Sequence, residues 1–270
     1  MTDFDDGPEI VLPAGDVTEG VVRIGDTVRR PHQRTSERVA AYLRHLESVG
    51  FAGAPRYLGR DAQGRDVLTF VAGEVPGDPV EPWAAADTVL CGVGRLVRAL
   101  HDASAGWQPD IDLSPPAGRP PPALPAGETR LVAQRDVTPQ NVVFRGGVAV
   151  ALIDFDLTGW TTRSVDLANT AQHWVPLSAP EDRGPAYADV DIGGRLGLLL
   201  DAYGRDQVSP GALLDACALR FAGLHESMRW NAENLGGGWQ RMWDAGVGEM
   251  IRRREQWFAG ARKQLEQSLH

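Results

Sequence analysis

Lysine is scarce in this sequence. The 27 Lys and Arg residues include a single lysine, Lys263, so arginine supplies nearly all of the positive charge. Arginines are therefore the obvious candidates for holding a phosphate or a carboxylate elsewhere in the chain. A guanidinium holds such oxyanions through two parallel hydrogen bonds, whereas an ammonium acts as a compact point charge.

Cysteine and long apolar runs are also scarce. Cys91 and Cys217 lie far apart in apolar, helix-like segments without metal-ligand spacing, and we expect them to be core thiols. No apolar run approaches the roughly 20 residues that span a bilayer. The acidic start, residues 1–6, lacks the basic and apolar regions of a secretion signal. We therefore expect a cytoplasmic protein without membrane association.

The sequence has no excess of basic charge. Its formal net charge of −9 argues against non-specific binding of nucleic acid, which needs a basic surface. Residues 151–245 hold 13 Asp and Glu against 7 Arg, a net of −6. Acidic helices there would attract a cationic small molecule by electrostatic steering. The alternative is that these acids only solvate the outer faces of helices.

The pattern along the chain predicts two lobes. Residues 9–72 read as short strands with one helix, whose apolar residues follow helical spacing from Arg34 to Leu46. The Pro- and Gly-rich stretch Val75–Pro82 is the expected linker, so residues 1–75 form one lobe and residues 76–270 the other. A chain of 270 residues with 43% hydrophobic content can fill one large or two small cores.

The second lobe is expected to be mainly helical. The Pro-rich segment Ser114–Pro125 must be an extended loop, either a surface excursion or a recognition segment for another protein. Helical patterns are expected at Trp83–Ser104, Asp166–Trp174, Val190–Tyr203, Pro210–Asn234 and Trp239–Leu265.

A hairpin is predicted in the middle of the chain. Val142–Phe144 and Val148–Ile153 are rich in β-branched residues, and Arg145-Gly146-Gly147 between them is typical of a turn. Such a hairpin brings its two ends side by side.

Polar residues flank both ends of this hairpin. Asp136 precedes Asn141 by five residues, and Asp154 and Asp156 follow the second strand. Asn141 and Asp154 can then share one divalent cation, while Asp136 lies one loop away. This order of a base and two magnesium ligands is typical of phosphoryl transfer. An ordinary polar turn is the alternative.

The segment from Arg130 to Leu177 resembles the aminoglycoside phosphotransferase and choline kinase family, small-molecule kinases with a protein-kinase-like fold. The resemblance implies an α+β, bilobal fold with a small N-terminal antiparallel sheet lobe and a larger, mainly helical C-terminal lobe. The resemblance extends over about two thirds of the chain. Val21–Arg30 resembles the family's second and third strands, and Ser36–Val49 resembles its N-lobe helix. Leu68–Glu74 resembles its hinge strand, and Val97–His101 resembles the end of its first C-lobe helix.

The resemblance assigns roles to further residues. The hinge backbone at Phe70 and Val71 would bind the nucleotide base, and Gly20 lies where a nucleotide-covering loop would be. Asp166 would cap its helix and anchor the loop around Asp154. Asp156 would be a second-metal or outer-shell ligand.

Two departures from the family pattern stand out. The family's His-Gly-Asp is replaced by Gln134-Arg135-Asp136, in which the Gln134 amide can do part of the structural work of the histidine. The phosphate-anchoring lysine of the third strand is missing. Arg29 or Arg30 falls in its place, and only one of them can point toward the nucleotide because adjacent strand residues face opposite sides.

The sequence therefore predicts an ATP- or GTP-dependent, Mg²⁺-requiring phosphotransferase that acts on a hydroxyl of a small molecule, with Asp136 as the base. A metabolite kinase of the choline, homoserine or thiamine type would share every motif. A nucleotide-binding pseudokinase with weak or no catalysis is a third interpretation, motivated by Gln134, Arg135 and the absent lysine. A protein kinase fits least, because the segment after Asp156 does not read as an activation loop.

Overall fold

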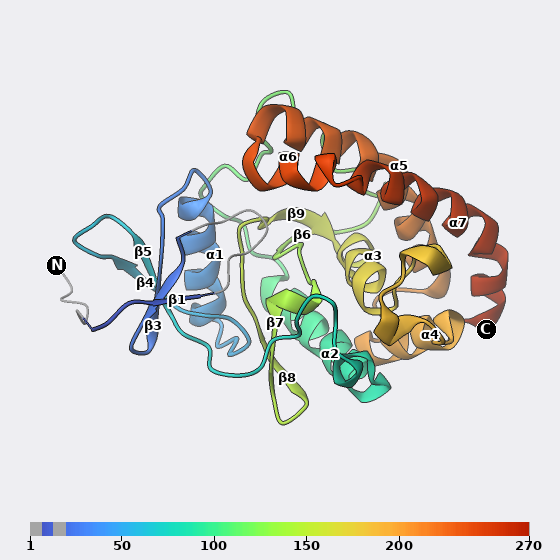
Figure 1. The fold of residues 1–270 in the computed structure, drawn as a ribbon, viewed down its shortest axis with the longest axis horizontal. Coiled ribbons are helices and arrows are strands. Elements are labelled where there is room, and N and C mark those ends of the chain that lie inside the picture. The colour runs from blue at the N-terminus through green and yellow to red at the C-terminus, as the bar shows by residue number, and fades with distance from the viewer. Residues whose placement is uncertain (1–6, 13–19, 270) are drawn as a thin grey trace.

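The computed structural model describes residues 7–12 and 20–269. The acidic start used above for the prediction of location lies outside the described residues. Figure 1 shows a strand-rich part with one helix at the left and a larger helical part at the right. The mixed α/β architecture confirms the predicted fold class, and the division of the chain into residues 1–75 and 76–270 stays a prediction.

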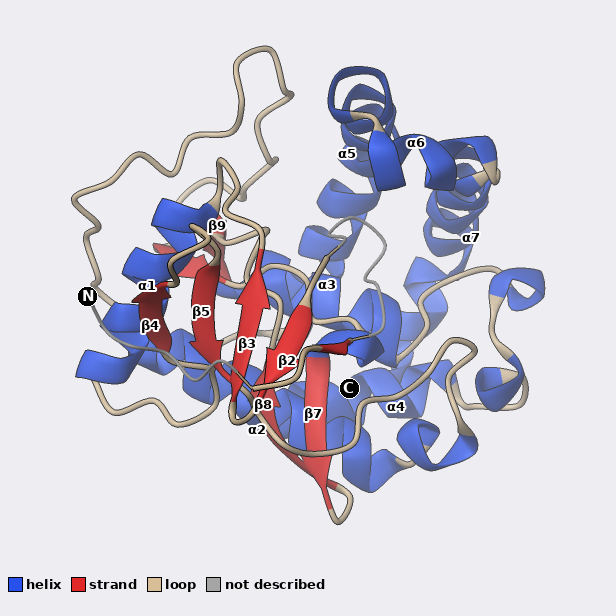
Figure 2. Ribbon diagram, turned by 60° about the vertical axis from the view of Figure 1, so that its left-hand side comes forward, coloured by secondary structure: helices blue, strands red, loops and turns tan. Residues whose placement is uncertain are grey.

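The smaller part is a five-stranded antiparallel sheet in the order β1-β2-β3-β5-β4 (Figure 2). Its strands follow the expected alternation of buried and more exposed side chains. Val22 and Ile24 of β2 are buried, whereas Arg23 between them is not. Gly25 turns the chain between β2 and β3 with a φ of 56°. The strands are β1 Ile10–Val11, β2 Val22–Ile24, β3 Thr27–Arg30, β4 Tyr57–Arg60 and β5 Asp66–Thr69.

Helix α1, Ser36–Ser48, connects this sheet with the helical part. Its residues at helical spacing, Val39, Tyr42, Leu43 and Leu46, are buried in the shared core. The Tyr42 hydroxyl donates to the Val132 carbonyl at 3.0 Å, so the helix is fixed to the strand that leads into the proposed catalytic loop.

The connecting segment is bonded to the central hairpin. Glu74 and Phe144 exchange two backbone hydrogen bonds, at 2.8 and 2.7 Å. A Cβ on Gly73 would lie 2.4 Å from the Phe144 carbonyl oxygen, so only glycine allows this approach. The segment is therefore held against the hairpin.

The predicted hairpin is present. β7, Val142–Arg145, pairs with β8, Val148–Leu152, around Gly146 and Gly147, which both have positive φ. A second antiparallel pair is formed by β6, Arg130–Ala133, which precedes the hairpin in the chain, and β9, Gly159–Thr162, which follows it. The chain leaving β6 and the chain leaving β8 thus carry the polar residues singled out above.

Six further helices form the larger part, in which α2 packs on α4, α3 on α5, and α5 on α7. Most of the expected helices are confirmed, with two corrections. A 3₁₀ turn precedes α2, which begins at Asp87 rather than Trp83. The helix expected over Trp239–Leu265 is two helices, because Gly246 breaks it with a φ of 90°. The bounds are α2 Asp87–Ser104, α3 Arg163–Trp174, α4 Ile192–Tyr203, α5 Pro210–Leu235, α6 Gly237–Asp244 and α7 Val247–Ser268, with 3₁₀ turns at Pro82–Ala85, Pro139–Asn141, Pro180–Asp182 and Pro185–Tyr187.

The segment Ser114–Pro125 contains no helix or strand, as predicted. It belongs to the long green loop that Figure 1 shows rising toward α5 and α6. A Cβ on Gly118 would lie 3.7 Å from Nε1 of Trp230 on α5, so the loop passes close to that helix.

None of the helices in the described ranges has the length and apolar character needed to cross a membrane.

Candidate active site

Asp136 and Asn141 are joined in the loop between β6 and β7. The Asn141 Nδ2 donates to both Asp136 Oδ2 and the Asp136 carbonyl, each at 2.9 Å. The Asn141 carbonyl accepts from the Ile153 backbone N–H at 2.9 Å. This bond places Asn141 beside the end of β8, next to Asp154, as the hairpin geometry predicts.

Gln134 ties the loop to the chain after β8. Its Nε2 donates to the carbonyls of Asp136, Ile153 and Asp154 at 3.1, 2.9 and 2.8 Å, and its Oε1 accepts from the Asp136 N–H at 2.7 Å. The side chain is fully buried. A neutral amide provides donor and acceptor at once, so Gln134 can hold both segments with one side chain.

Two residues near the loop adopt a left-handed backbone. Arg135 has a φ of 67° and Asp154 a φ of 52°, and the other positive-φ residues described are all glycines. For a residue with a Cβ this conformation costs roughly 1–2 kcal/mol. Such strain concentrates at functional sites.

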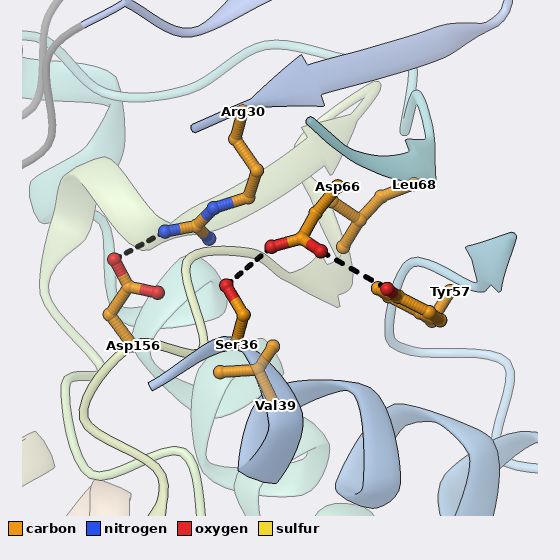
Figure 3. A pocket seen from close by; sticks show the side chains of 7 residues that line it. All are labelled: Arg30, Ser36, Val39, Tyr57, Asp66, Leu68 and Asp156. Carbon is orange, nitrogen blue, oxygen red and sulfur yellow. Dashed lines mark hydrogen bonds and ion pairs between the residues drawn. The ribbon is translucent and has the colours of Figure 1, made fainter. Parts of the chain in front are cut away.

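The carboxylates of Asp154 and Asp156 face Arg30 of β3. The Arg30 guanidinium is hydrogen-bonded to the Asp156 carboxylate and lies 3.9 Å from Asp154 Oδ1. Figure 3 shows Arg30 reaching Asp156 across a small pocket. The pocket has a volume of about 10 Å³, enough for roughly one water molecule. Its lining is Arg30, Ser36, Val39, Tyr57, Asp66, Leu68 and Asp156.

Arg29 and Arg30 face opposite sides of β3. Arg29 is 1% exposed, and its Nε lies 3.6 Å from Asp61 at the sheet. Arg30 points to the carboxylates after β8. Of the two candidates for the phosphate anchor, the geometry favours Arg30, and Arg29 is a buried structural cation.

The donors near Asp154 suit a hard cation. Burial and the Asp156 carboxylate raise the pKa of Asp154, and Arg30 opposes this shift. Since Asn141 gives its Nδ2 to Asp136, its Oδ1 can face a cation. The described residues contain no cluster of three or more His, Cys, Asp and Glu that could hold a metal. Two protein oxygens fit Mg²⁺, which keeps several waters and uses phosphate oxygens as ligands.

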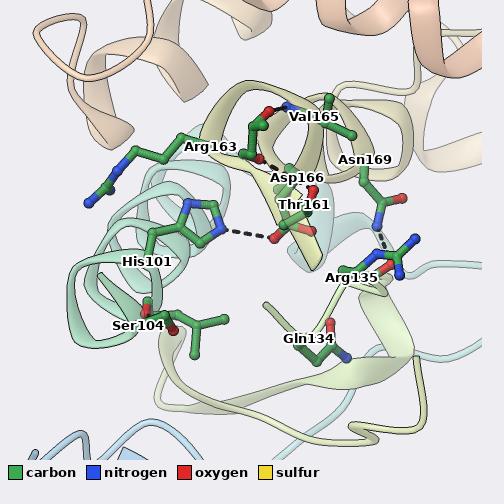
Figure 4. Close-up of polar contacts among 12 residues, drawn as sticks. His101, Ser104, Gln134, Arg135, Thr161, Arg163, Val165, Asp166 and Asn169 are labelled. Carbon is green, nitrogen blue, oxygen red and sulfur yellow. Dashed lines mark hydrogen bonds and ion pairs between the residues drawn. The ribbon is translucent and has the colours of Figure 1, made fainter. Parts of the chain in front are cut away.

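Asp166 has a different role from the one predicted. Helix α3 begins at Arg163, and its cap is Thr162, whose side chain accepts from the Val165 N–H. Asp166 is one turn further on and buried, and it accepts from His101 Nε2 at 2.9 Å (Figure 4). It lies within electrostatic range of Arg135, so any support it gives to the loop is electrostatic rather than a helix cap.

The hinge residues are placed less favourably than expected. The Phe70 N–H already donates to the Asp26 carbonyl at 2.8 Å, so this donor is not available to a nucleotide base. Val71 follows it in the segment that leads to the linker. Gly20 has a φ of 76° and lies beside Pro31, while residues 13–19 of the loop are outside the described part.

Comparisons with known proteins identify the family of the chain. The model of the phosphotransferase enzyme family matches residues 119–207. The trifolitoxin immunity protein of Rhizobium leguminosarum bv. trifolii is 32% identical over 224 residues, which cover 77% of this chain and 78% of that protein. The chain belongs to the phosphotransferase enzyme family.

Solved structures place the fold among those of phosphotransferase family proteins. A choline/ethanolamine kinase family protein from Mesorhizobium loti has a TM-score of 0.55 at 16% identity, with 93% of each chain covered. The amicoumacin kinase hAmiN, in complex with AMP-PNP, Ca²⁺ and Ami, has a TM-score of 0.59 at 10% identity, with 93% of this chain and 88% of that chain covered.

In this member of the phosphotransferase enzyme family, two arginines that the sequence pattern did not predict lie beside Asp136 and Asp156, respectively. Arg220 of α5 lies within electrostatic range of Asp136 and donates to Asn169 Oδ1 at 2.6 Å. Asn169 Nδ2 in turn donates to the Arg135 carbonyl at 2.7 Å, as Figure 4 shows. Arg38 of α1 donates to the Asp156 carbonyl at 3.1 Å. The high arginine content was the only sequence signal for these two arginines.

Proposed function

We propose that the protein is an ATP- or GTP-dependent phosphotransferase that moves the γ-phosphoryl group to a hydroxyl of a small molecule. The observation that carries the proposal is the joining of Asp136 to Asn141, together with the backbone bond from Ile153 that sets Asn141 next to Asp154. Membership of the phosphotransferase enzyme family supports the same function.

The proposed reaction assigns one step to each group. Asp136 orients the acceptor hydroxyl and takes its proton as the oxygen bonds to the γ-phosphorus. The bond between that phosphorus and the β–γ bridging oxygen breaks, and the nucleoside diphosphate leaves. Arg30 would exchange its bond with Asp156 for the nucleotide phosphates.

Asn141 and Asp154 would hold Mg²⁺, which neutralises phosphate charge when bound. Asp156 would hold a second ion or its water shell. The amicoumacin kinase hAmiN was solved with AMP-PNP and Ca²⁺, which supports a nucleotide and a divalent cation for this chain as well.

A nucleotide-binding protein with weak or no catalysis is the second candidate. It is favoured by the ion pair between Arg30 and Asp156, which already neutralises one of the carboxylates proposed for cation binding.

The acceptor can be a metabolite or a toxic compound. A metabolite kinase of the choline, homoserine or thiamine type is compatible with the same residues. The similarity to a trifolitoxin immunity protein supports a role in self-protection, in which the acceptor would be a hydroxyl-bearing toxin.

A transfer assay tests the proposal. Purified protein is incubated with Mg²⁺ and γ-labelled ATP or GTP, and with aminoglycosides, amino alcohols, nucleosides and hydroxy acids. We expect labelled product with one class and none with the Asp136→Asn variant. Nucleotide binding without transfer to any class would favour the second candidate.

A further inference from the structure

The peptide unit between Arg135 and Asp136 is held on both of its edges. A peptide unit is planar, and in the trans form its carbonyl oxygen and its N–H point in opposite directions. On one edge, the Asp136 N–H donates to Gln134 Oε1 at 2.7 Å. On the other edge, the Arg135 carbonyl accepts from Asn169 Nδ2 at 2.7 Å, a bond that Figure 4 shows. The backbone that carries Asp136 is therefore fixed both from the loop itself and from helix α3.

Asn169 is oriented by an arginine of another helix. Arg220 of α5 donates from its Nη2 to Asn169 Oδ1 at 2.6 Å. Because a guanidinium can only donate, the amide oxygen of Asn169 must face Arg220, and its Nδ2 must face the loop. Asn169 is 2% exposed, so its amide is shielded from water. Arg220 thus determines that Asn169 presents a donor to the Arg135 carbonyl.

The guanidinium of Arg220 is bonded to two side chains on one face of α3. Besides its bond to Asn169, it donates from Nε to Gln172 Oε1 at 3.3 Å, three residues further along the helix. Gln172 Nε2 then meets His173 Nε2 at 3.2 Å, so this ring nitrogen must be an acceptor. A neutral ring agrees with the pKa of His173, which burial and neighbouring cations lower to about 3.

A fixed peptide matters because Arg135 is strained. Its φ of 67° is one that a residue with a Cβ rarely adopts. Its side chain also needs room: a Cβ on Gly159 of β9 would lie 2.7 Å from Arg135 Nη1. If the bond from Asn169 were lost, the loop would relax toward an unstrained backbone, and the Asp136 carboxylate would move with it.

We propose that Arg220 is a positioning residue, which acts through Asn169 to hold the peptide before Asp136 and so to aim its carboxylate at the acceptor hydroxyl. The inference rests on the proposed transferase function for the role of Asp136. It adds a contribution from the helical lobe that no local motif reveals, because Asn169 is 34 residues from Arg135 and Arg220 is 51 residues from Asn169.

Hydrogen exchange of backbone amides measures the hold on the loop without catalysis. Exchange is followed by mass spectrometry in nucleotide-free protein, for peptides that cover residues 134–138 and for peptides of α3. The variants are Asn169→Ala, Arg220→Met, the double variant and Arg220→Lys. Thr170→Val is the matched control. Thr170 is the next residue of α3 and is also buried, but its hydroxyl donates to the Asp166 carbonyl of its own helix at 3.0 Å.

We expect exchange at residues 134–138 to rise roughly fivefold or more in Asn169→Ala and in Arg220→Met, as for the loss of one hydrogen bond. The double variant should stay within about twofold of the faster single variant, because both changes break the same chain of bonds. Arg220→Lys keeps a donor for the Asn169 oxygen and should recover part of the protection. Exchange in the α3 peptides, and in Thr170→Val, should change little.

Two results of this measurement would overturn the inference. One is exchange at the wild-type rate in Arg220→Met. The other is single effects that multiply in the double variant and extend over α3, as expected if the two residues only pack the helices together. The comparison of Arg220→Met with Arg220→Lys decides the matter even if Asn169→Ala does not fold.

Kinetics separate the positioning of the base from a general loosening of the protein. With the acceptor found in the transfer assay, Asn169→Ala and Arg220→Met should lower kcat roughly tenfold and leave Mg·ATP affinity nearly unchanged. Arg220 also lies within electrostatic range of Asp136, but Asn169→Ala keeps this charge, so a fall in kcat there is not a direct charge effect. Neither change should lower kcat further in the Asp136→Asn background.

Unchanged kcat in variants whose loop exchanges faster would overturn the positioning role. If the wild type phosphorylates no acceptor, the proposed function fails. The exchange rates then still decide whether Arg220 holds the loop through Asn169.

Discussion

At the scale of single residues, Asp136 is held by two amide side chains. Gln134 accepts from its N–H and Asn141 donates to its carboxylate. The neutral variant Asp136→Asn keeps the shape of the loop but cannot accept a proton. We expect kcat to fall by a factor of roughly a hundred or more, with nucleotide affinity nearly unchanged. Wild-type turnover by this variant with the best acceptor would contradict the role of Asp136.

Arg29 and Arg30 give a matched pair on one strand. Arg30→Ala should weaken nucleotide binding at least tenfold in calorimetry, and Arg30→Lys should recover part of it because the charge remains. Arg29→Ala should leave binding intact. It should instead lower the free energy of unfolding by about 3 kcal/mol, since it leaves Asp61 with one cation fewer in a buried place. The reverse pattern would assign the anchor to Arg29.

The backbone of Arg135 offers a measurement of strain. Arg135→Gly and Arg135→Ala both remove the guanidinium, but only glycine adopts a φ of 67° without cost. The glycine variant should therefore be more stable than the alanine variant by about 1 kcal/mol in urea unfolding. Equal stability of the two variants would show that the loop relaxes.

At the scale of elements, the His101–Asp166 pair joins α2 to α3, and His101 Nδ1 meets the Tyr203 hydroxyl of α4 at 2.8 Å. All three residues are at most 1% exposed. His101→Ala should lower the free energy of unfolding by about 3 kcal/mol, because it leaves a buried carboxylate unpaired.

His45→Ala is the control for this prediction. His45 also lies in the last turn of its helix, but it is only half-buried. Its hydrogen bond is to a single carbonyl, that of Ala103, and its ring stacks on Trp107 with 4.6 Å between the ring centroids. Its loss should cost less than about 1.5 kcal/mol. Similar losses in the two variants would mean that the pair contributes nothing beyond ordinary burial.

Elements specified by local sequence were predictable. The hairpin followed from two β-branched runs around Gly146 and Gly147, and its closure brought Asn141 next to Asp154. The break between α6 and α7 was missed, because a single glycine in a helical pattern does not reveal whether it takes a left-handed φ. Asp166 was misassigned for a related reason: its partner, His101, is 65 residues away.

At the scale of the whole molecule, nucleotide binding should stabilise both lobes together. Occupancy at a hundred times Kd contributes about 2.7 kcal/mol, and for a chain of this size the Tm should rise by about 5 °C or more. Asp154→Ala should remain folded and lose the rise produced by Mg·ATP. EDTA should have the same effect on the wild type. An unchanged rise in Asp154→Ala would exclude it as the main magnesium ligand.

The charge around the site could not be predicted from regional counts. Arg30, Arg38 and Arg220 are spread over more than half of the chain, and only the packed fold brings them to Asp156 and Asn169 at the site. The acids counted in residues 151–245 were real, but side chains such as those of Asp201 and Asp215 lie on outer faces. A net charge counted along the sequence gives buried and exposed charges equal weight, whereas a bound ligand interacts mainly with the charged side chains nearest to it.

The single lysine has a practical consequence. Lys263 is exposed on α7, the last helix, and the residues gathered around Asp154 and Asp156 include no primary amine. Acylating nucleotide analogues, which tag kinases through an amine beside the phosphates, should therefore leave this protein unlabelled at its pocket. Among the side chains, an amine-reactive dye would instead mark Lys263 alone, and so provide a fluorescent reporter on the helical lobe with the arginine side chains of the site unmodified.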